Sequence, residues 1–372
     1  MEAMDYRGNI ELMLCEGATE RLSPINGILE LTPLCNMNCD MCFVRLSPQE
    51  MHRQGRLRSG EEWIAMAREI ARAGTLFVLL TGGEPLLHPD FREIYLALKK
   101  MAMILTINTN GTLIDEEWAD FFARHKPRRI NITLYGKDEA TYDRLCHYPD
   151  GYRRARNAVR LLMERHVDVK INGSITPENI DDLDELCGIA EDMNTAWKFD
   201  TYMYPAAKER PAGFDQQARL SPQQAAAAWV RVMQRKEKEH FLREASRLLA
   251  LGHAPAGEEV PSPMKCRAGR SSFVINWQGK MRPCVMLTEP QTDAFEKGFA
   301  PAWEEITDRV SQIQLNARCS ACTMRDACQT CAACAFWETG AFDGVPEYRC
   351  QYTREILRLL EDACKKAEEG NG

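Results

Sequence analysis

Long apolar runs and an excess of basic residues are both missing from this sequence, and each absence excludes a class of function. The longest aliphatic runs, such as Leu76–Leu80, are far shorter than the roughly 20 residues that cross a membrane. The acidic N-terminus has no basic segment followed by an apolar stretch, which predicts no export signal. The formal net charge is −7 and the basic runs are short, which argues against nucleic acid as a partner. We therefore expect a cytoplasmic protein that binds neither membranes nor nucleic acid.

Cysteine is what the sequence has in abundance, with 15 residues in a chain of 372. This length suits one large domain with an extension. Thiols stay reduced in the cytoplasm, so this many cysteines point to metal ligands and not to disulfides. Eleven of the fifteen form two groups in the sequence. We expect the remaining four to be buried apolar residues: Cys15, Cys146, Cys187 and Cys364.

The first group is Cys35, Cys39 and Cys42, spaced C-x3-C-x2-C on one short segment. Three thiolates can hold three irons of a [4Fe–4S] cluster and leave the fourth iron open, as in metal sites that bind a substrate. A structural zinc ion is the alternative reading. Zinc needs four ligands, however, and no histidine or fourth cysteine lies nearby in the sequence to complete the set.

Between residues 26 and 205, short aliphatic runs alternate with segments of helical period. The predicted strands are Gly27–Thr32, Leu76–Thr81, Met103–Asn108, Arg129–Leu134, Val167–Ser174 and Trp197–Met203. The predicted helices are Gly60–Ala73, Asp90–Met101, Asp115–His125, Tyr152–Arg165 and Asn179–Met193. Such alternation predicts an α/β fold of parallel βα units, here a partial (β/α)6 barrel. Ligands bind at the carboxyl ends of such strands, and the first cysteine group directly follows the first strand.

The remainder of the chain changes composition from segment to segment. Ser221 begins a long helical stretch that runs to about Leu251, and Gly252–Pro263 is a linker rich in proline and glycine. We divide the chain into an N-terminal extension (1–25), the barrel (26–205), a helical connector and linker (206–263), a small cysteine-rich domain (264–355) and a C-terminal helix or tail (356–372).

A second motif, Thr81-Gly82-Gly83-Glu84-Pro85, stands at the end of the second predicted strand. Its two glycines let the backbone approach a ligand closely, and Glu84 offers a carboxylate that can accept hydrogen bonds from an ammonium group. Alone, the motif is explained equally well as a plain strand-to-helix turn. Because the motif follows the strand directly after the cysteine group, the interpretation as a ligand-binding turn is strengthened.

Together the two motifs resemble the signature of radical S-adenosylmethionine (SAM) enzymes. The resemblance implies that SAM chelates the open iron through its amino and carboxylate groups. It also implies that the motif residues bind the SAM amino group: Gly82, Gly83, Glu84 and Pro85. Met41 stands where the family has a residue against the adenine, Thr133 matches a contact to the ribose or carboxylate, and Arg144 matches an arginine that pairs with the carboxylate. Asn110, Asn172 and Thr201, at or near strand ends, are further candidates, for which a strand cap explains the residue equally well.

The second group has eight cysteines: Cys266, Cys284, Cys319, Cys322, Cys328, Cys331, Cys334 and Cys350. Its spacing resembles the SPASM extension of radical SAM enzymes, which implies two auxiliary [4Fe–4S] clusters; paired zinc ribbons are the alternative. The outer cluster would use Cys319, Cys322, Cys328 and Cys350, and the inner cluster Cys266, Cys284, Cys331 and Cys334. This chain departs from the family pattern at position 332, where it has Ala332 and the family has a cysteine. If only one of the flanking Cys331 and Cys334 binds iron, the inner cluster keeps an open iron.

The resemblance implies a radical SAM oxidoreductase that cleaves SAM to a 5′-deoxyadenosyl radical and takes hydrogen from a peptide or protein. Thioether or carbon–carbon cross-linking, oxidation and epimerisation of a ribosomal peptide are the expected outcomes. A dehydrogenase or coupling enzyme for a small molecule is the alternative, and a non-catalytic iron–sulfur electron carrier is a weaker one. A sulfatase maturase is disfavoured by Val285, where that group has an aspartate base. We assign no catalytic residue, and the candidates for an acid or base are Tyr135, Asp200, Tyr202 and Tyr204.

The expected partners are a peptide or protein substrate and a reductant such as flavodoxin or ferredoxin. Many peptide-modifying relatives carry a leader-binding domain of some eighty residues before the barrel. Only about 25 residues precede the first predicted strand here, too few for a domain of that kind. We therefore expect that the surfaces of the barrel and the cysteine-rich domain hold a leader peptide, that a separate protein delivers it, or that the substrate is small.

Overall fold

The computed structural model describes residues 6–204 and 219–370. Its centre is a nine-stranded sheet with the order β10-β9-β8-β1-β2-β3-β4-β5-β6. Six neighbouring strands pair in parallel and in sequence order: β1 (Asn26–Thr32), β2 (Phe77–Gly82), β3 (Ile104–Thr109), β4 (Arg129–Thr133), β5 (Val169–Ser174) and β6 (Ala196–Asp200). These are the six predicted strands. The last ends at Asp200 and not at Met203, because the chain leaves the sheet after its pairing with Ser174.

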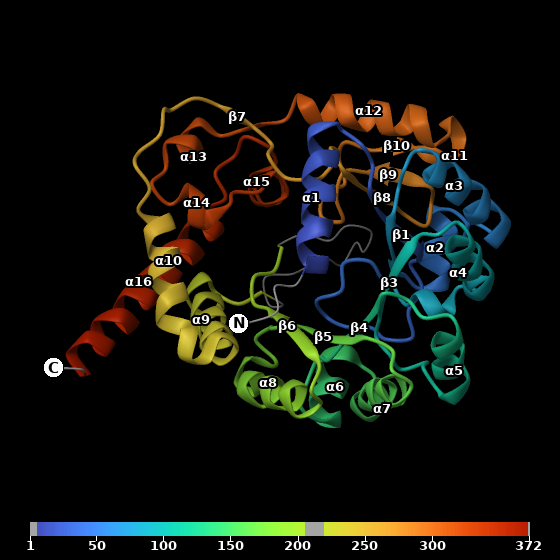
Figure 1. The fold of residues 1–372 in the computed structure, drawn as a ribbon, viewed down its shortest axis with the longest axis horizontal. Coiled ribbons are helices and arrows are strands. Elements are labelled where there is room, and N and C mark those ends of the chain that lie inside the picture. Colours follow the sequence, from blue (N-terminus) through green and yellow to red (C-terminus); the bar gives the residue numbers. More distant parts are fainter. Residues whose placement is uncertain (1–5, 205–218, 371–372) are drawn as a thin grey trace.

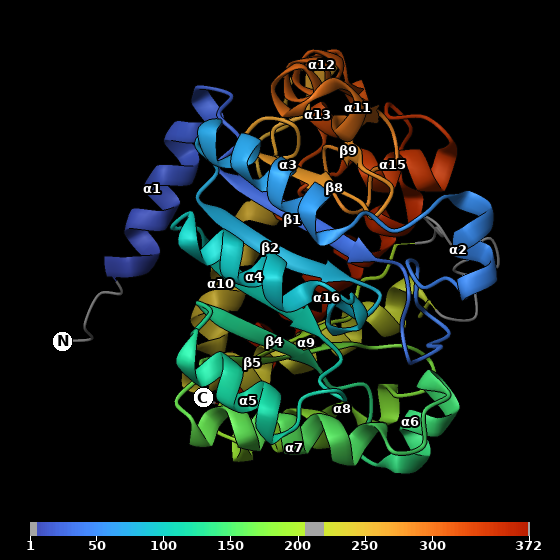
Figure 2. The ribbon, with the colours of Figure 1, turned by 90° about the vertical axis from the view of Figure 1, so that its right-hand side faces the viewer.

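Helices cover the outer face of this parallel sheet (Figure 2). The predicted ones are α3 (Gly60–Arg72), α4 (Phe91–Lys100), α5 (Glu116–Arg124), α7 (Gly151–Glu164) and α8 (Leu183–Asp192). Ser59 begins α3 with a reciprocal capping box to Glu62, which satisfies two backbone N–H groups at the helix start. Three further helices were not predicted: α1 (Tyr6–Glu20), α2 (Pro48–Gln54) and α6 (Glu139–Cys146).

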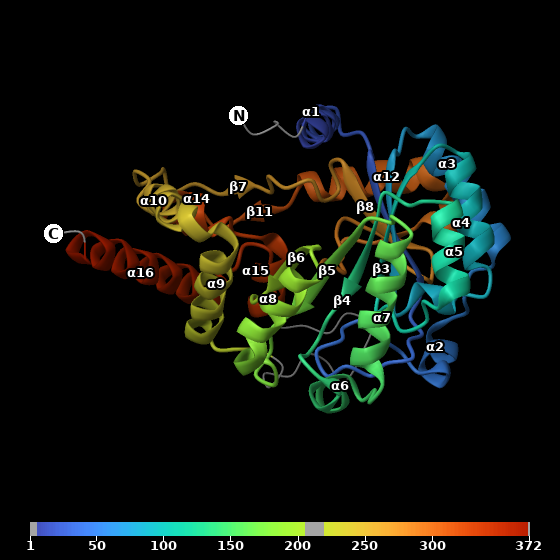
Figure 3. The same ribbon diagram turned by 60° about the horizontal axis from the view of Figure 1, so that its bottom comes forward.

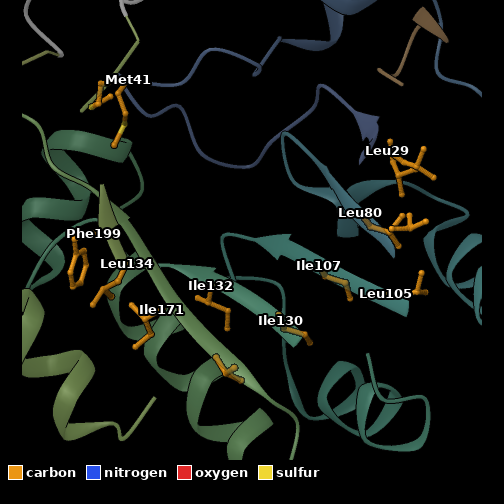
Figure 4. Packing of buried hydrophobic residues seen from close by; sticks show 14 of the residues in the cluster. Leu29, Met41, Leu80, Leu105, Ile107, Ile130, Ile132, Leu134, Ile171 and Phe199 are labelled. Atoms are coloured by element: carbon orange, nitrogen blue, oxygen red, sulfur yellow. The ribbon is translucent and has the colours of Figure 1, made fainter. Parts of the chain in front are cut away.

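The main core lies between the sheet and these outer helices. Along β3 and β4, burial alternates, so that Leu105, Ile107, Ile130 and Ile132 are buried and face the helices. Figure 4 shows them in one cluster with apolar side chains of the neighbouring strands. The alternate positions, such as Asn108, point to the opposite face. Polar residues therefore line the interior of the partial barrel, where a ligand is expected.

The cysteine-rich region continues the same sheet. The strand β8 (Ser272–Ile275) pairs in parallel with β1, β9 (Lys280–Arg282) is antiparallel to β8, and β10 (Thr292–Asp293) is antiparallel to β9. Our sequence division assigned these strands to a separate small domain. In the structure, backbone hydrogen bonds cross that boundary, so the region is fixed directly against the first barrel strand.

Helices form most of the remaining C-terminal half (Figures 1 and 3). The predicted long connector helix is broken at Lys238 (φ 47°) into α9 (Pro222–Glu237), the turn η4 (Lys238–His240) and α10 (Phe241–Gly252). The other elements are β7 (Ser262–Pro263), α11 (Ala294–Lys297), α12 (Phe299–Ser311), β11 (Gln314–Leu315), α13 (Ala317–Ala321), α14 (Arg325–Cys328), α15 (Ala332–Thr339) and α16 (Glu347–Gly370). Among the described residues, no helix is long and apolar enough to cross a membrane. The boundary that we predict at residue 205 lies outside the described residues.

Candidate active site

The cysteine loop that follows β1 is held on one side by the glycine motif at the end of β2. The backbone N–H of Gly83 donates to the Thr32 carbonyl oxygen at 2.7 Å, and that of Glu84 donates to the Leu34 carbonyl oxygen at 2.8 Å. A Cβ atom on Gly82 would lie 2.3 Å from the Thr32 oxygen, and Gly82 has φ 141°. The glycines are therefore required by the close approach of the cysteine loop, a reason that differs from the ligand contact we expected.

The end of α6 holds the other side of the loop. The backbone N–H groups of Asn38 and Asp40 donate to the carbonyl oxygens of Cys146 and Leu145, both at 3.0 Å. These bonds flank Cys39 and bring its thiol against that of Cys146. The Cys146 thiol and burial together raise the pKa of Cys39. The sequence predicts Cys146 to be buried, which it is, but gives no sign that it touches the cysteine loop.

A cavity of about 650 Å³ opens between this loop and the carboxyl ends of the strands. The predicted residues that line it are Cys35, Cys39, Cys42, Met41, Gly82, Gly83, Asn110, Thr133 and Asn172. The four candidate acids or bases line the same cavity: Tyr135, Asp200, Tyr202 and Tyr204. The fold thus brings together predicted residues as far apart as Cys35 and Tyr204, which are 169 positions apart in the sequence.

Glu84 and Pro85 do not line the cavity. The Glu84 carboxylate is fully buried and accepts hydrogen bonds from Thr109 Oγ1 at 2.9 Å and from the backbone N–H of Asn110 at 2.8 Å. A third bond comes from the backbone N–H of Leu86 at 3.1 Å. Burial raises the pKa of Glu84 to about 7. This carboxylate therefore ties the end of β2 to the end of β3 and is turned away from an incoming ammonium group.

Arg144 and Thr201 are also placed outside the cavity. Arg144 lies on the outer surface of α6, with its Nε atom 3.9 Å from the carboxylate of Glu178. Thr201 is buried, and its hydroxyl lies 3.4 Å from the Tyr352 hydroxyl. Contacts of these two residues with SAM stay predictions that the described geometry does not support.

The cysteine loop fits an iron–sulfur cluster by the chemistry of its donors. Backbone N–H groups of Met37 and Arg45 point at the sulfurs of Cys35 and Cys42 at 3.4 and 3.3 Å, and the Asn110 amide points at Cys35 at 3.6 Å. Burial raises the pKa of Cys35, and the Glu84 charge adds to this. Three such thiols can ionise together only beside positive charge, which iron supplies. Within residues 6–204 and 219–370, no group of three or more His, Cys, Asp or Glu side chains is placed to hold a metal ion.

The cavity also offers an acceptor that suits a nucleotide-like ligand. Asn172 is next to Thr133 in the sheet register, and both residues line the cavity. The Oδ1 atom of Asn172 is buried and has no hydrogen-bond partner in the part of the chain that the structure describes. A buried acceptor of this kind is costly unless a ligand donates to it, as a ribose hydroxyl or an amino group can.

The auxiliary cysteines influence one another within two groups. Burial raises the pKa of Cys266 and of Cys284, and the charge of Cys331 adds to both. Cys331 and Cys334 face one another; the Cys334 thiol lowers the pKa of Cys331 to about 5, and Cys331 in turn raises that of Cys334.

In the other group, burial and then the charges of Cys328 and Cys322 raise the pKa of Cys319. Burial and the charge of Cys328 raise the pKa of Cys350 to about 11. Each group is thus a set of thiols close enough to repel one another as thiolates, and this repulsion would be relieved by bound iron.

Comparison with known proteins supports the same view of the barrel. Residues 29–189 match the family model of the Radical SAM superfamily. An AdoMet-dependent heme synthase of Methanosarcina barkeri is 22% identical over 84% of this chain and 92% of its own length. A PqqA peptide cyclase of Bradyrhizobium diazoefficiens is 25% identical over 70% of this chain and 66% of its own length.

Among solved structures, Streptococcus suis SuiB bound to the precursor peptide SuiA is similar in fold, with a TM-score of 0.68. The two are 17% identical over 94% of this chain and 82% of SuiB. At this identity the likeness concerns the fold, a partial barrel with a C-terminal extension, and not the reaction.

Proposed function

We propose that this chain, which contains a radical SAM domain and is related to peptide-modifying enzymes, cleaves SAM reductively and takes hydrogen from a peptide. The observation that carries the proposal is the gathering of Cys35, Cys39 and Cys42 in one cavity with the two glycines at the end of β2 and the polar ends of β3, β4 and β5. Bound there, a [4Fe–4S] cluster would supply the electron that splits SAM into methionine and a 5′-deoxyadenosyl radical.

The chain's own residues hold and orient these groups. The three cysteines would bind the cluster, and the Asn110 amide, which also bonds the Asn36 side chain at 2.8 Å, fixes Cys35. Met41, Asn172 and Thr133 line the cavity, where Met41 would present an apolar side chain to the adenine and the other two would offer polar atoms to the ribose. The aromatic side chains of Tyr135 and Tyr204 would exclude water from the reacting carbon.

The eight remaining cysteines would hold two auxiliary clusters. We assign Cys319, Cys322, Cys328 and Cys350 to the outer cluster and Cys266, Cys284, Cys331 and Cys334 to the inner cluster. The mutual effects on pKa within each group support this division. These clusters would accept the electron that the substrate loses.

A peptide substrate is supported by the relatives: one is a PqqA peptide cyclase, and SuiB is seen with a precursor peptide. A small-molecule substrate is the second candidate, because the heme synthase is matched over most of both chains.

The test is anaerobic co-expression of the chain with a short peptide encoded beside its gene, followed by mass spectrometry of the peptide.

Loss of two hydrogens is the expected result, and the matched control is the Cys39→Ala variant, which should leave the peptide mass unchanged. An unchanged mass with the active chain calls for the same experiment in deuterated water, since epimerisation alters no mass in ordinary water. No deuterium uptake would contradict the peptide proposal and favour the small-molecule candidate.

A further inference from the structure

Tyr202 connects the active-site cavity to one of the auxiliary cysteines. It follows β6 by two residues, and its side chain lines the cavity. Its hydroxyl donates to Cys334 Sγ at 3.1 Å and has a second acceptor, Glu338 Oε1, at 3.3 Å. A single phenol thus reaches from the cavity to a sulfur that we assign to the inner auxiliary cluster.

Glu338 is itself held in place. Its Oε1 atom accepts from Arg219 Nη2 at 3.1 Å, in an ion pair whose side chains are only 11% and 9% exposed. Its Oε2 atom accepts from the backbone N–H of Tyr348 at 3.2 Å. Because Arg219 and Tyr348 hold Glu338 beside Tyr202, the one hydrogen of the Tyr202 hydroxyl is shared between this carboxylate and the sulfur.

The ring of Tyr202 is fixed by its neighbours as well. The Arg349 guanidinium lies 4.9 Å from the ring centroid and donates twice to the Cys328 carbonyl oxygen. The Arg219 guanidinium lies 5.3 Å from the same centroid, and the ring of Tyr352 stands edge-on at 5.3 Å. Because these three side chains pack against the ring, the Tyr202 hydroxyl has little freedom to move away from Cys334.

We infer that Tyr202 is a positioning residue that raises the reduction potential of the inner auxiliary cluster through its hydrogen bond to Cys334. Hydrogen bonds to cluster sulfurs are among the factors that set iron–sulfur potentials. Reduction adds negative charge to the sulfurs, so a donor stabilises the reduced cluster more than the oxidised one. The inference rests on the proposed function, because it needs Cys334 to be a cluster ligand.

The experiment is a redox titration of the full chain with all clusters bound, followed by electron paramagnetic resonance. In Tyr202→Phe, the ring stays and the donor is lost, so we expect the ratio of reduced to oxidised inner cluster at a fixed potential to fall about tenfold, or about 59 mV for one electron. Tyr348→Phe is the matched control: its hydroxyl donates to the Leu220 carbonyl oxygen at 2.8 Å and not to sulfur, so the potential should stay unchanged.

A second replacement, of Tyr202 by 3,5-difluorotyrosine, keeps the ring and makes the hydroxyl a stronger donor. It should shift the reduction potential upward, whereas Tyr202→Phe should shift it downward. A merely structural disturbance would not give shifts of opposite sign in the two variants. If Tyr202→Phe loses the inner cluster altogether, the shift in the 3,5-difluorotyrosine variant tests the inference: an upward shift supports it, and no shift or a downward shift overturns it. The same potential in both variants and in the unaltered chain would overturn the inference.

Iron analysis separates this failure from a failure of the proposed function. If Cys334→Ala retains the iron content and the auxiliary-cluster spectrum of the unaltered chain, Cys334 is no ligand, and the assignment of the inner cluster is wrong. If Cys334→Ala loses inner-cluster iron while Tyr202→Phe leaves the potential unchanged, the ligand assignment stands and only the role of Tyr202 is refuted.

Discussion

At the scale of single residues, a methyl group at position 83 would stand 2.4 Å from the Leu34 carbonyl oxygen and 2.8 Å from that of Pro33. Both are backbone atoms of the segment that leads into the cysteine loop, and they cannot rotate away as a side chain could. The neighbouring hydrogen bonds from Gly83 and Glu84 to this segment depend on the same close approach.

We therefore predict that Gly83→Ala displaces the cysteine loop, at a cost of about 1–3 kcal/mol in the free energy of unfolding. Iron bound at Cys35, Cys39 and Cys42 should fall sharply, while auxiliary iron is retained. Iron analysis of Gly83→Ala and of the unaltered chain, with and without SAM, measures this loss of iron. Gly188→Ala on α8 is the control, since its added methyl would meet only the flexible Arg235 side chain at 3.5 Å. Unchanged iron at Cys35, Cys39 and Cys42 in Gly83→Ala would contradict the prediction.

At this scale, the sequence predicts which residues form much of the site but not the specific contacts between them. The cysteine spacing and the glycine motif are local, so their place after β1 and β2 could be predicted. The contact of Cys146 with Cys39 depends on where the short helix α6 ends, and nothing local reveals it. Glu84 is equally instructive, because only the structure shows that its carboxylate is occupied by donors from β3.

At the scale of elements, His88 joins the starts of two outer helices. It is 2% exposed, and its Nε2 atom lies 3.0 Å from the Arg58 carbonyl oxygen just before α3. Its Nδ1 atom accepts from the backbone N–H of Asp90 at 3.2 Å, so the ring is neutral with its proton on Nε2. Asp90 in turn accepts from the backbone N–H of Gly60 at 2.7 Å, which completes the link between α3 and α4.

Burial lowers the pKa of His88 below the usual 6.5, so the unfolded chain binds a proton there more readily than the folded chain. The stability that this residue contributes is complete above pH 6.5 and is lost as the pH falls below it. We predict that His88→Gln flattens the decline of the melting temperature between pH 7.5 and 5.5, measured under anaerobic conditions. His52→Gln, at an exposed site on α2, should leave the slope unchanged. An equal slope in the unaltered chain and in His88→Gln would contradict this account.

The predictability of the elements follows the range of the interactions. The six parallel strands are short runs rich in aliphatic or aromatic residues and could be predicted, whereas α6 has only eight residues and a weak pattern. The long connector helix was predicted as continuous, because its break at Lys238 carries no proline or glycine. The pairing of β8 with β1 joins residues some 245 positions apart, which a local pattern cannot reveal.

At the scale of the whole molecule, the barrel and the cysteine-rich region are one continuous structure. Besides the pairing of β8 with β1, Arg58 Nη2 donates to the Gln278 carbonyl oxygen at 2.9 Å, and the backbone N–H of Phe299 donates to Glu69 Oε2 at 2.7 Å. α9 and α10 pack against the long α16. The auxiliary cysteines are consequently held at a fixed place relative to the cavity.

The central claim is that Cys35, Cys39 and Cys42 support reductive cleavage of SAM. It is tested most directly by measuring 5′-deoxyadenosine after the cluster-loaded chain is reduced in the presence of SAM. We predict 5′-deoxyadenosine from the unaltered chain and none from Cys39→Ala, which should still bind its auxiliary iron. No 5′-deoxyadenosine from the unaltered chain, with or without a peptide, or equal amounts from Cys39→Ala, would contradict the account.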